Sequence, residues 1–245
     1  MKQFVQAGGR AIATAGLIEA LGEKGFQDIV EVAVGGRRVM ATRSSSGRFG
    51  GSATPAEPDL NILLPQIRRF ENDNRLVINY EPALSGYPMA ISSAYGQGTF
   101  CVLPIPDDFA DLYRLPQNVL NQLRALLCRE MFVRLDAPHH VSLFAYDNRT
   151  FIVQNFQPQP VNTHVSLLQG ATLHDLLSGL TISATANAES GISVGSGARA
   201  GLGSGGPSFA VPVPAHSFRV FAAKRLERPF ACLAGQILPA RLAAR

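Results

Sequence analysis

The most constraining feature of this chain is a change in pattern near residue 130. Beyond it come short runs rich in Val, Thr, Phe and Tyr, such as "HVSLFAYDNRTFIVQNF", "NTHVSLL" and "HSFRVFAA", without long helical segments between them. Such runs are typical of a small antiparallel β-sandwich. We expect Asp147-Asn148 to supply the positive φ angles of a two-residue hairpin turn. The sequence therefore predicts an all-β domain over residues 131–226.

Before residue 130, strand and helix patterns alternate, which predicts an α/β domain over residues 1–130. Strands are expected at residues 10–14, 26–34, 37–43, 61–68, 76–80, 89–94 and 99–103. Gly35-Gly36 is expected to turn the chain between the second and third of these. An early helix with an apolar face should end at Gly25, and a later helix should begin at Pro116.

Two segments have compositions that disfavour a packed core, and a third follows the predicted domains. Residues 43–58 are polar and rich in Gly and Ser, and residues 183–208 form a low-complexity Gly/Ser tract that we expect to be a mobile, disordered loop. Residues 227–245 follow the last predicted strand, and we expect them to be a tail.

Composition excludes some classes of function. The 245 residues are 46% hydrophobic and 16% charged, and a net charge of +4 comes from scattered arginines rather than a dense basic stripe. A nucleic-acid-binding face needs clustered Lys and Arg, so we expect no nucleic-acid partner. No apolar run approaches the roughly 18 residues of a membrane span. Arg10 and Glu19 interrupt any signal-peptide core, so the compartment stays open, with the cytoplasm as the default.

Cysteine and histidine spacing does not predict a metal site. Cys101 and Cys128 lie in apolar stretches and should be buried free thiols, and Cys232 has no partner at metal-ligand spacing. The five histidines form no HExxH or HxH arrangement. We therefore expect neither a metal nor another cofactor.

The stretch "SSAYGQGTFCVLPIPDD", residues 92–108, contains the candidate binding residues. Gly96 and Gly98 lie between two predicted strands rather than between a strand and a helix, so they should turn the chain rather than cradle a phosphate. Asp107 and Asp108 follow a strand and precede a helix, where a carboxylate caps the helix or contacts a ligand. With Tyr113, they are the residues for which ligand binding is predicted.

Two further motifs, at residues 191–195 and 148–150, match known functional patterns. "GISVG", residues 191–195, matches G-x-S-x-G, but a hydrolase elbow at Ser193 should be followed by an acid and then a histidine. Here His216 precedes Glu227, the reverse order. Asn148-Arg149-Thr150 is an N-x-T sequence, and its place in a predicted turn favours a backbone role for Asn148.

Three segments together carry a family resemblance: "GRAIATAGLIEALGEKGFQDIVEV", "GYPMAISSAYGQGTFCVLPIPDDFADLYRLP" and "VSLFAYDNRTFIVQNFQPQPV". They resemble the region that follows the catalytic barrel in large bacterial glycoside-hydrolase-like proteins, nearest to the family 42 β-galactosidases. The resemblance covers about residues 8–226. It implies an amidotransferase-like (flavodoxin-like) α/β domain, here N-terminally truncated and incomplete, followed by a small β-domain.

The resemblance also implies what this chain lacks. In the family the catalytic glutamates belong to the (β/α)8 barrel, and a barrel needs about 200 to 400 residues, which do not fit here. The amidotransferase relatives use a cysteine at a strand-helix elbow, and neither Cys101 nor Cys128 has the glycines for it. We therefore assign no catalytic residue.

The resemblance leaves three functions open. The first is a non-catalytic accessory region that gives structural support, subunit contacts or cleft walls, with an upstream catalytic barrel missing. The second is a free-standing carbohydrate-binding or assembly module, and the third is a serine hydrolase acting through Ser193. A carbohydrate ligand and a homo-oligomer are the expected partners, although the chain has no Trp for stacking on a sugar.

Overall fold

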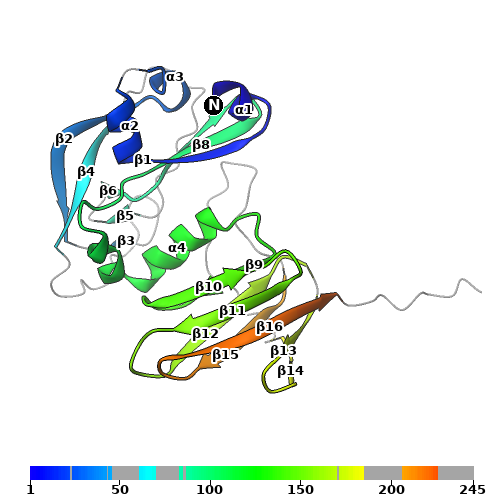
Figure 1. Ribbon diagram of the computed structural model, residues 1–245. Coiled ribbons are helices and arrows are strands. Elements are labelled where there is room, and N and C mark those ends of the chain that lie inside the picture. The colour runs from blue at the N-terminus through cyan, green and yellow to red at the C-terminus, as the bar shows by residue number, and fades with distance from the viewer. Residues whose placement is uncertain are drawn as a thin grey trace, which may run out of the picture.

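The computed structural model describes residues 1–22, 24–42, 44–45, 61–69, 83–84, 87–169, 171–184 and 206–225. Figure 1 shows a β-sandwich made from the later part of the chain, and above it a group of smaller sheets and short helices. The helix α4 (Gln117–Leu127) lies between them. The described residues are mostly β-structure.

The sandwich consists of two antiparallel sheets. One has five strands in the order β10-β11-β16-β13-β14, and the other has three in the order β15-β12-β9. Their bounds are β9 (Val133–Asp136), β10 (Val141–Ala145), β11 (Thr150–Asn155), β12 (Val161–Leu167), β13 (Ala171–Asp175), β14 (Thr181–Ile182), β15 (Ser208–Val213) and β16 (Ser217–Arg225). Every strand pair within these two sheets is antiparallel. The predicted antiparallel sandwich is confirmed.

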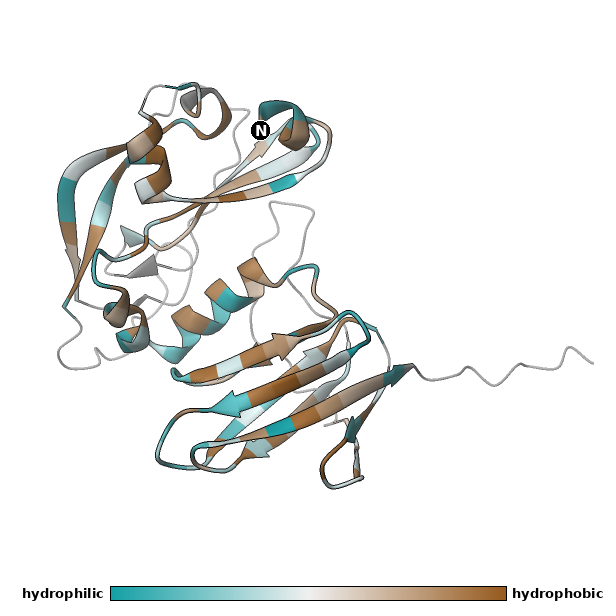
Figure 2. Cartoon of the chain, in the orientation of Figure 1, coloured by the Kyte–Doolittle hydropathy of each residue, from teal (hydrophilic) through white to brown (hydrophobic). Residues whose placement is uncertain are grey.

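Alternation along the strands builds the core of the sandwich. In β11, Phe151 and Val153 are buried while the residues between them are partly exposed. Phe209 and Val211 alternate in the same way on β15 of the facing sheet. Side chains of both inner faces form one buried cluster, made only from residues 133–223. Figure 2 shows hydrophobic residues along the strands that contribute to it.

The earlier part of the chain forms three small sheets rather than one. These are β1-β8-β7, the pair β2-β4, and β3-β5-β6. The strand bounds are β1 (Arg10–Thr14), β2 (Val32–Ala41), β3 (Ser44–Ser45), β4 (Ile62–Arg69), β5 (Ala83–Leu84), β6 (Tyr87–Pro88), β7 (Ile91–Tyr95) and β8 (Gly98–Leu103). The helices are α1 (Lys2–Gln6), α2 (Ala15–Leu21), α3 (Gln27–Val30) and the 3-10 helix η1 (Phe109–Arg114).

The α/β prediction for this part is met only coarsely. Strands and helices do occur together, but among the described strands β1 and β8 are the one parallel pair. A flavodoxin-like sheet needs several parallel strands joined by crossover helices. The amidotransferase-like fold is therefore not confirmed. Of the predicted strands, residues 10–14, 61–68, 89–94 and 99–103 correspond to β1, β4, β7 and β8, whereas residues 76–80 lie outside the described residues.

Two local predictions in this region were wrong. β2 runs continuously through Gly35-Gly36, which form no turn; the pairing with β4 shifts between Val34 and Arg38. Glycine inside a strand often marks such an irregularity. Residues 27–30 form the short helix α3 instead of a strand, because this turn buries Ile29 and Val30 in the core.

Two turn predictions were also misplaced. α2 ends at Leu21 with Gly22 (φ 53°) as its cap, so the helix stops before Gly25. In the β10–β11 hairpin the positive φ falls on Arg149 (φ 64°), and not on Asp147 or Asn148. The hairpin loop is therefore longer than the two-residue type, and its turn is followed by one residue in the left-handed conformation. Asn148 contributes through its side chain, whose Oδ1 accepts a hydrogen bond from the N–H of Thr150 at 3.0 Å.

The tight reversal predicted at Gly96 and Gly98 is confirmed. β7 and β8 pair up to Tyr95 and Gly98, which leaves Gly96 (φ 62°) and Gln97 as the turn. Gly98 is required for a different reason. A β-carbon there would overlap the carbonyl oxygens of Val5 and Gly9, because α1 and the chain after it pack directly on this turn.

Replacing Gly98 with Ala should lower the free energy of unfolding by on the order of 1–3 kcal/mol, because two backbone carbonyls must move. Chemical denaturation measures the change. Gly36→Ala is the matched control, since no atom lies within 4 Å of the β-carbon it would add. The control should change stability by less than about 0.5 kcal/mol. Equal losses for both variants would contradict the close-packing explanation.

Candidate functional site

Asp107 joins the segment before η1 to the strand β2. The Nε of Arg38 donates a hydrogen bond to Asp107 Oδ2 at 2.6 Å. Both side chains are partly exposed, and an ion pair in such a setting contributes little to stability. The pair raises the pKa of Arg38, chiefly through this hydrogen bond. The Asp107 carboxylate thus already has a cationic partner within the chain.

Asp108 is the N-cap of η1, which is one of the two roles expected of it. Its Oδ1 accepts a hydrogen bond from the N–H of Ala110 at 2.9 Å, and its backbone has the extended conformation of a cap. This interaction satisfies a backbone donor that the start of the helix leaves unpaired. The neighbouring carboxylate, Asp107, pairs with Arg38 instead.

Tyr113, on the exposed side of η1, contacts the loop between β9 and β10 of the sandwich. Its ring stacks on that of His140, with centroids 4.2 Å apart and planes 11° apart. The Nδ1 atoms of His139 and His140 lie 2.6 Å apart, so one donates and the other accepts. His140 itself has a positive φ of 54°. Tyr113 therefore links the two parts of the molecule, a partner that its sequence position did not indicate.

The strongest link between the two parts is Arg124 of α4. Its guanidinium donates to the carbonyl oxygens of Ala137 and Pro138 (3.1 Å), in the loop between β9 and β10, and of Val141 (3.1 Å), the first residue of β10. It also donates to Asn121 Oδ1 at 2.9 Å. Burial lowers the pKa of Arg124, and the converging carbonyl dipoles offset this cost.

Two other residues complete the attachment of α4. The Oδ1 of Asn121 also accepts from the N–H of Ala137 at 3.2 Å. On the other side, Arg10 of β1 donates to the carbonyl oxygen of Leu126. α4 is therefore bonded to the first group of sheets and to the sandwich. Sequence analysis identified the apolar face of α4 but missed these polar residues.

A charged group lies where β9 meets β12. Asp136 is directly opposite His164 in the strand register, and Arg134 lies two residues earlier on the same face of β9. Burial raises the pKa of Asp136, and this effect exceeds the opposite one of the positive charges on His164, Arg124 and Arg134, which lower it. The Nε of Arg134 is buried and has no hydrogen-bond partner among the described residues. Such perturbed groups can mark a functional site, but they occur in structural ion networks as well.

Asp175 forms a second buried polar centre at the end of β13. Its carboxylate accepts hydrogen bonds from the N–H groups of Leu177 (2.9 Å) and Ser178 (3.2 Å) and from Arg219 Nε (2.6 Å). Burial alone would raise its pKa, but these hydrogen bonds and the Arg219 charge outweigh burial and hold the pKa of Asp175 below its ordinary value. The carboxylate fixes the β13–β14 turn.

The cysteines within the described residues are not activated. Cys101 is buried and Cys128 half-buried, as free thiols. Burial raises the pKa of both thiols, which keeps them protonated and unreactive. The burial predicted for Cys101 is confirmed, and for Cys128 it is partial. Cys232, Ser193, the tail and most of the 183–208 tract lie outside the described residues.

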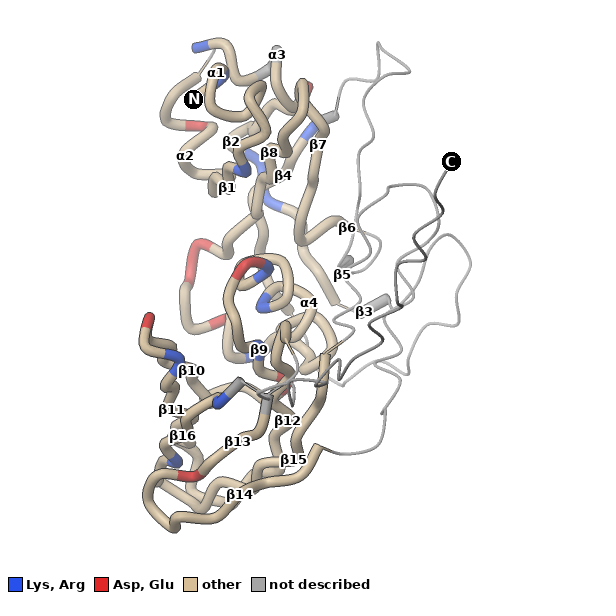
Figure 3. The backbone as a smooth tube through the Cα atoms, turned by 90° about the vertical axis from the view of Figure 1, so that its right-hand side faces the viewer, with Lys and Arg blue, Asp and Glu red and all other residues tan. Residues whose placement is uncertain are grey.

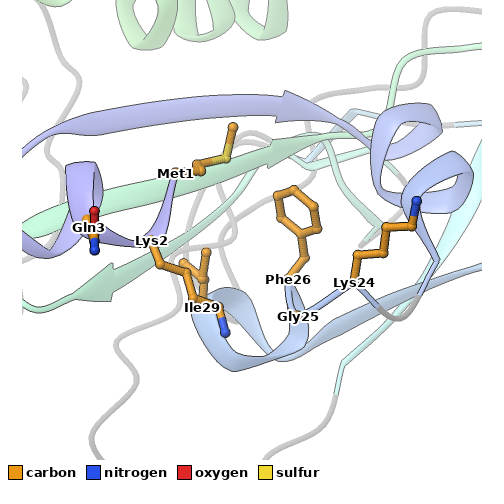
Figure 4. A pocket seen from close by; sticks show the side chains of 7 residues that line it. All are labelled: Met1, Lys2, Gln3, Lys24, Gly25, Phe26 and Ile29. Atoms are coloured by element: carbon orange, nitrogen blue, oxygen red, sulfur yellow. The ribbon is translucent and has the colours of Figure 1, made fainter.

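A pocket of about 360 Å³ lies beside α1 and α3. Its lining residues include Phe26 and Ile29, with Lys2 and Lys24 adding the charged groups. Figure 4 shows the Phe26 ring between the side chains of Met1 and Lys24. None of the lining residues is a carboxylate, histidine, serine or cysteine. The pocket therefore lacks the acid–base and nucleophilic groups that most hydrolytic reactions need.

Within the described residues, no group of three or more His, Cys, Asp or Glu side chains could hold a metal ion. No helix in the described ranges is long and apolar enough to cross a membrane. Figure 3 shows Lys and Arg interspersed with Asp and Glu, several of both near α4.

The later part of the chain is thus a two-sheet antiparallel β-sandwich. Residues 132–223 match the model of the family described as "Probable glycosyl hydrolase, C-terminal domain". The resemblance to glycoside-hydrolase-like proteins is confirmed over this range, which includes every strand of the sandwich apart from the last residues of β16. No curated protein matches the chain.

Solved structures similar to this chain include three β-galactosidases. The first is Gan42B, a GH42 β-galactosidase from G. stearothermophilus, with 14% identity and a TM-score of 0.42 over 92% of this chain and 29% of that one. The second, from Bacillus circulans sp. alkalophilus, has 18% identity and a TM-score of 0.42 over 91% of this chain and 30% of that one. The third, from Rahnella sp. R3, has 16% identity and a TM-score of 0.41 over 91% of this chain and 30% of that one. This chain therefore spans less than a third of each. Similarity of this degree defines neither site nor activity.

Replacing Arg124 with Met should lower the free energy of unfolding by about 2–4 kcal/mol, because several buried carbonyl and amide oxygens lose a charged donor. Arg37→Met, at an exposed position of β2, is the control and should change stability by less than about 0.5 kcal/mol. Urea denaturation measures both. A loss in Arg124→Met no larger than the control's would contradict the importance of this link.

The Asp175 carboxylate predicts a defined pH dependence. Because its folded pKa lies below the ordinary value of 3.8, its contribution to stability is complete well above pH 4 and is lost as the pH falls through the folded pKa. The stability difference between wild type and Asp175→Asn should therefore be largest from pH 5 to 7 and shrink below about pH 4. Denaturation curves at each pH measure it; a difference that stays constant down to pH 3 would contradict the assignment.

Proposed function

We propose that this chain is a non-catalytic accessory region of a carbohydrate-active, glycoside-hydrolase-like protein. The observation that carries the proposal is the family match over residues 132–223, which coincides with a complete β-sandwich. A sandwich appended to a catalytic domain gives structural support, subunit contacts or a wall of the substrate cleft. The catalytic partner would be a barrel, on the same polypeptide or a separate one.

The arrangement around α4 is consistent with such a supporting role. On the sandwich side, Arg124 and Asn121 of α4 bond backbone groups of Ala137, and on the other side the Arg10 side chain donates to the carbonyl oxygen of Leu126 in α4. These groups hold the two parts of the chain in a fixed relation. A fixed relation suits a region that must present a defined surface to a neighbouring domain.

The division into domains belongs to the same proposal. We infer an incomplete amidotransferase-like domain over residues 1–130, a β-sandwich over residues 131–226 and a tail over residues 227–245. The hydrophobic clusters support the first boundary, since one is made of residues 133–223 and the other two of residues 5–123. The parallel pair β1–β8 is the feature that agrees with an amidotransferase-like origin.

The alternative is a free-standing carbohydrate-binding or assembly module. Tyr113 keeps 53% of its surface exposed beside its stacked His140, and Asp107 and Asp108 lie just before the same helix. Exposed aromatic rings and carboxylates are groups that can bind a sugar, through ring stacking and hydrogen bonding respectively. The third function, hydrolysis through Ser193, has no support within the described residues.

The proposal predicts that the purified chain hydrolyses neither nitrophenyl glycosides nor nitrophenyl esters, because no catalytic residue is assigned to it. The assay includes Ser193→Ala as a matched variant. Turnover that the variant abolishes would overturn the non-catalytic assignment.

The sequence of the genomic DNA around this coding region tests the accessory role. A catalytic barrel encoded in frame or in an adjacent gene would support it, and the absence of one would favour the free-standing module.

Thermal melts with a panel of mono- and disaccharides separate the two readings of Asp107, Asp108 and Tyr113. If these residues serve only structural contacts, no saccharide should raise the melting temperature, and Asp108→Asn should change the free energy of unfolding by less than about 0.5 kcal/mol, because Asn caps a helix about as well as Asp does. A saccharide that stabilises wild type, but neither Asp107→Asn nor Tyr113→Ala, would establish the binding site instead.

A further inference from the structure

The outward face of the five-stranded sheet carries apolar side chains in line across four neighbouring segments. Phe144 of β10 lies opposite Ile152 of β11, and Ile152 lies opposite Val220 of β16. Leu176, directly after β13, donates its backbone N–H to the carbonyl oxygen of Val220 at 2.8 Å, and so continues the line. We call Phe144, Ile152, Val220 and Leu176 the apolar row.

The apolar row faces away from the core of the sandwich. Ile152 lies between the buried Phe151 and Val153, so the alternation of the strand turns its side chain outward. Phe144 and Leu176 keep 44% and 52% of their surface exposed. An antiparallel sheet with one solvated face presents polar residues there, whereas a sheet that is covered on both faces is apolar on both. The row therefore indicates that a further segment packs on this face.

The tail of the chain starts at this sheet. β16 contributes Val220 to the apolar row and ends at Arg225, and residues 226–245 follow directly, outside the described residues. Val220 and Arg225 are five positions apart in the strand, so the row lies about 17 Å from the start of the tail. The twenty residues of the tail can span up to about 65 Å. The tail can therefore reach every residue of the row.

The middle of the tail is apolar and uncharged. Residues 229–240, "PFACLAGQILPA", contain no Asp, Glu, Lys, Arg or His, and arginines stand directly before and after them. Their large apolar side chains are Phe230, Leu233, Ile237 and Leu238. The apolar row has no charged member either, so contact between the two buries no unpaired charge. Because the tail is tethered beside the row, its effective concentration there is far above that of a separate molecule.

We propose that residues 229–240 fold back and pack on the apolar row of their own chain. The tether favours the tail over a second copy or another protein, because the tail leaves the strand that bears part of the row. Packing there removes two apolar surfaces from water at once. This inference goes beyond the accessory function proposed above and does not depend on it. The activity assay and the packing of the tail are separate measurements, so failure of one is distinguishable from failure of the other.

Cys232 lies within residues 229–240, and the rate at which its thiol reacts with a maleimide tests the packing. In the full chain Cys232 should react about tenfold or more slowly than in a synthetic peptide of residues 226–245, because the packed tail excludes the reagent. Phe144→Ser/Leu176→Ser should restore the rate of the peptide. Leu17→Ser/Leu63→Ser, at two leucines exposed elsewhere, is the control and should leave the slow rate unchanged. Circular dichroism shows that each variant is folded.

Disulfide trapping locates the packed tail without relying on loss of packing. Phe144→Cys should form a disulfide with Cys232 under mild oxidation, and peptide mapping by mass spectrometry identifies the bonded pair. Asn162→Cys, at an exposed position of β12 in the facing sheet, is the matched control and should not form one. A Cys232 thiol that reacts as fast in the full chain as in the peptide would overturn the proposal. So would a slow rate that Phe144→Ser/Leu176→Ser leaves unchanged, or equal trapping by both introduced thiols.

Discussion

The structure depends on the group of carbonyl oxygens that Arg124 binds. A guanidinium cannot give up its proton in a protein, so burying one requires acceptors that fit its planar fork. The loop between β9 and β10 supplies two carbonyl oxygens, the first residue of β10 supplies a third, and α4 supplies Asn121 Oδ1. The orientation of α4, the conformation of that loop and the position of His140 on Tyr113 all follow from this arrangement.

Much of the β-sandwich could be predicted because its signal is local. Alternation of apolar residues in "TFIVQN" specifies both strand type and buried face, whereas "SFAVPV" shows the same alternation but was not predicted as a strand. The earlier part was predicted less well, since the continuous strand through Gly35-Gly36 and the helix at Ile29-Val30 arise from packing between distant segments. Tertiary contacts override the turn preference of two glycines, and a single sequence does not reveal those contacts.

The candidate site shows the same limit. The capping role of Asp108 could be predicted, because a cap acts on the N–H groups of the next few residues. The partners of Asp107 and Tyr113 could not, since Arg38 is 69 residues away and His140 lies in the other part of the chain. Asp175 is a comparable case, because only the fold places it beside Arg219, 44 residues later.

The bonds on both sides of α4 have a consequence for how the molecule unfolds. Arg10 ties the helix to β1, and Arg124 ties it to the sandwich, so neither neighbour can separate without exposing the polar groups that the helix satisfies. Loss of either part leaves buried donors or acceptors unpaired on the other. The two parts should therefore melt in a single cooperative transition, and amide hydrogens of α4 should exchange only through global opening.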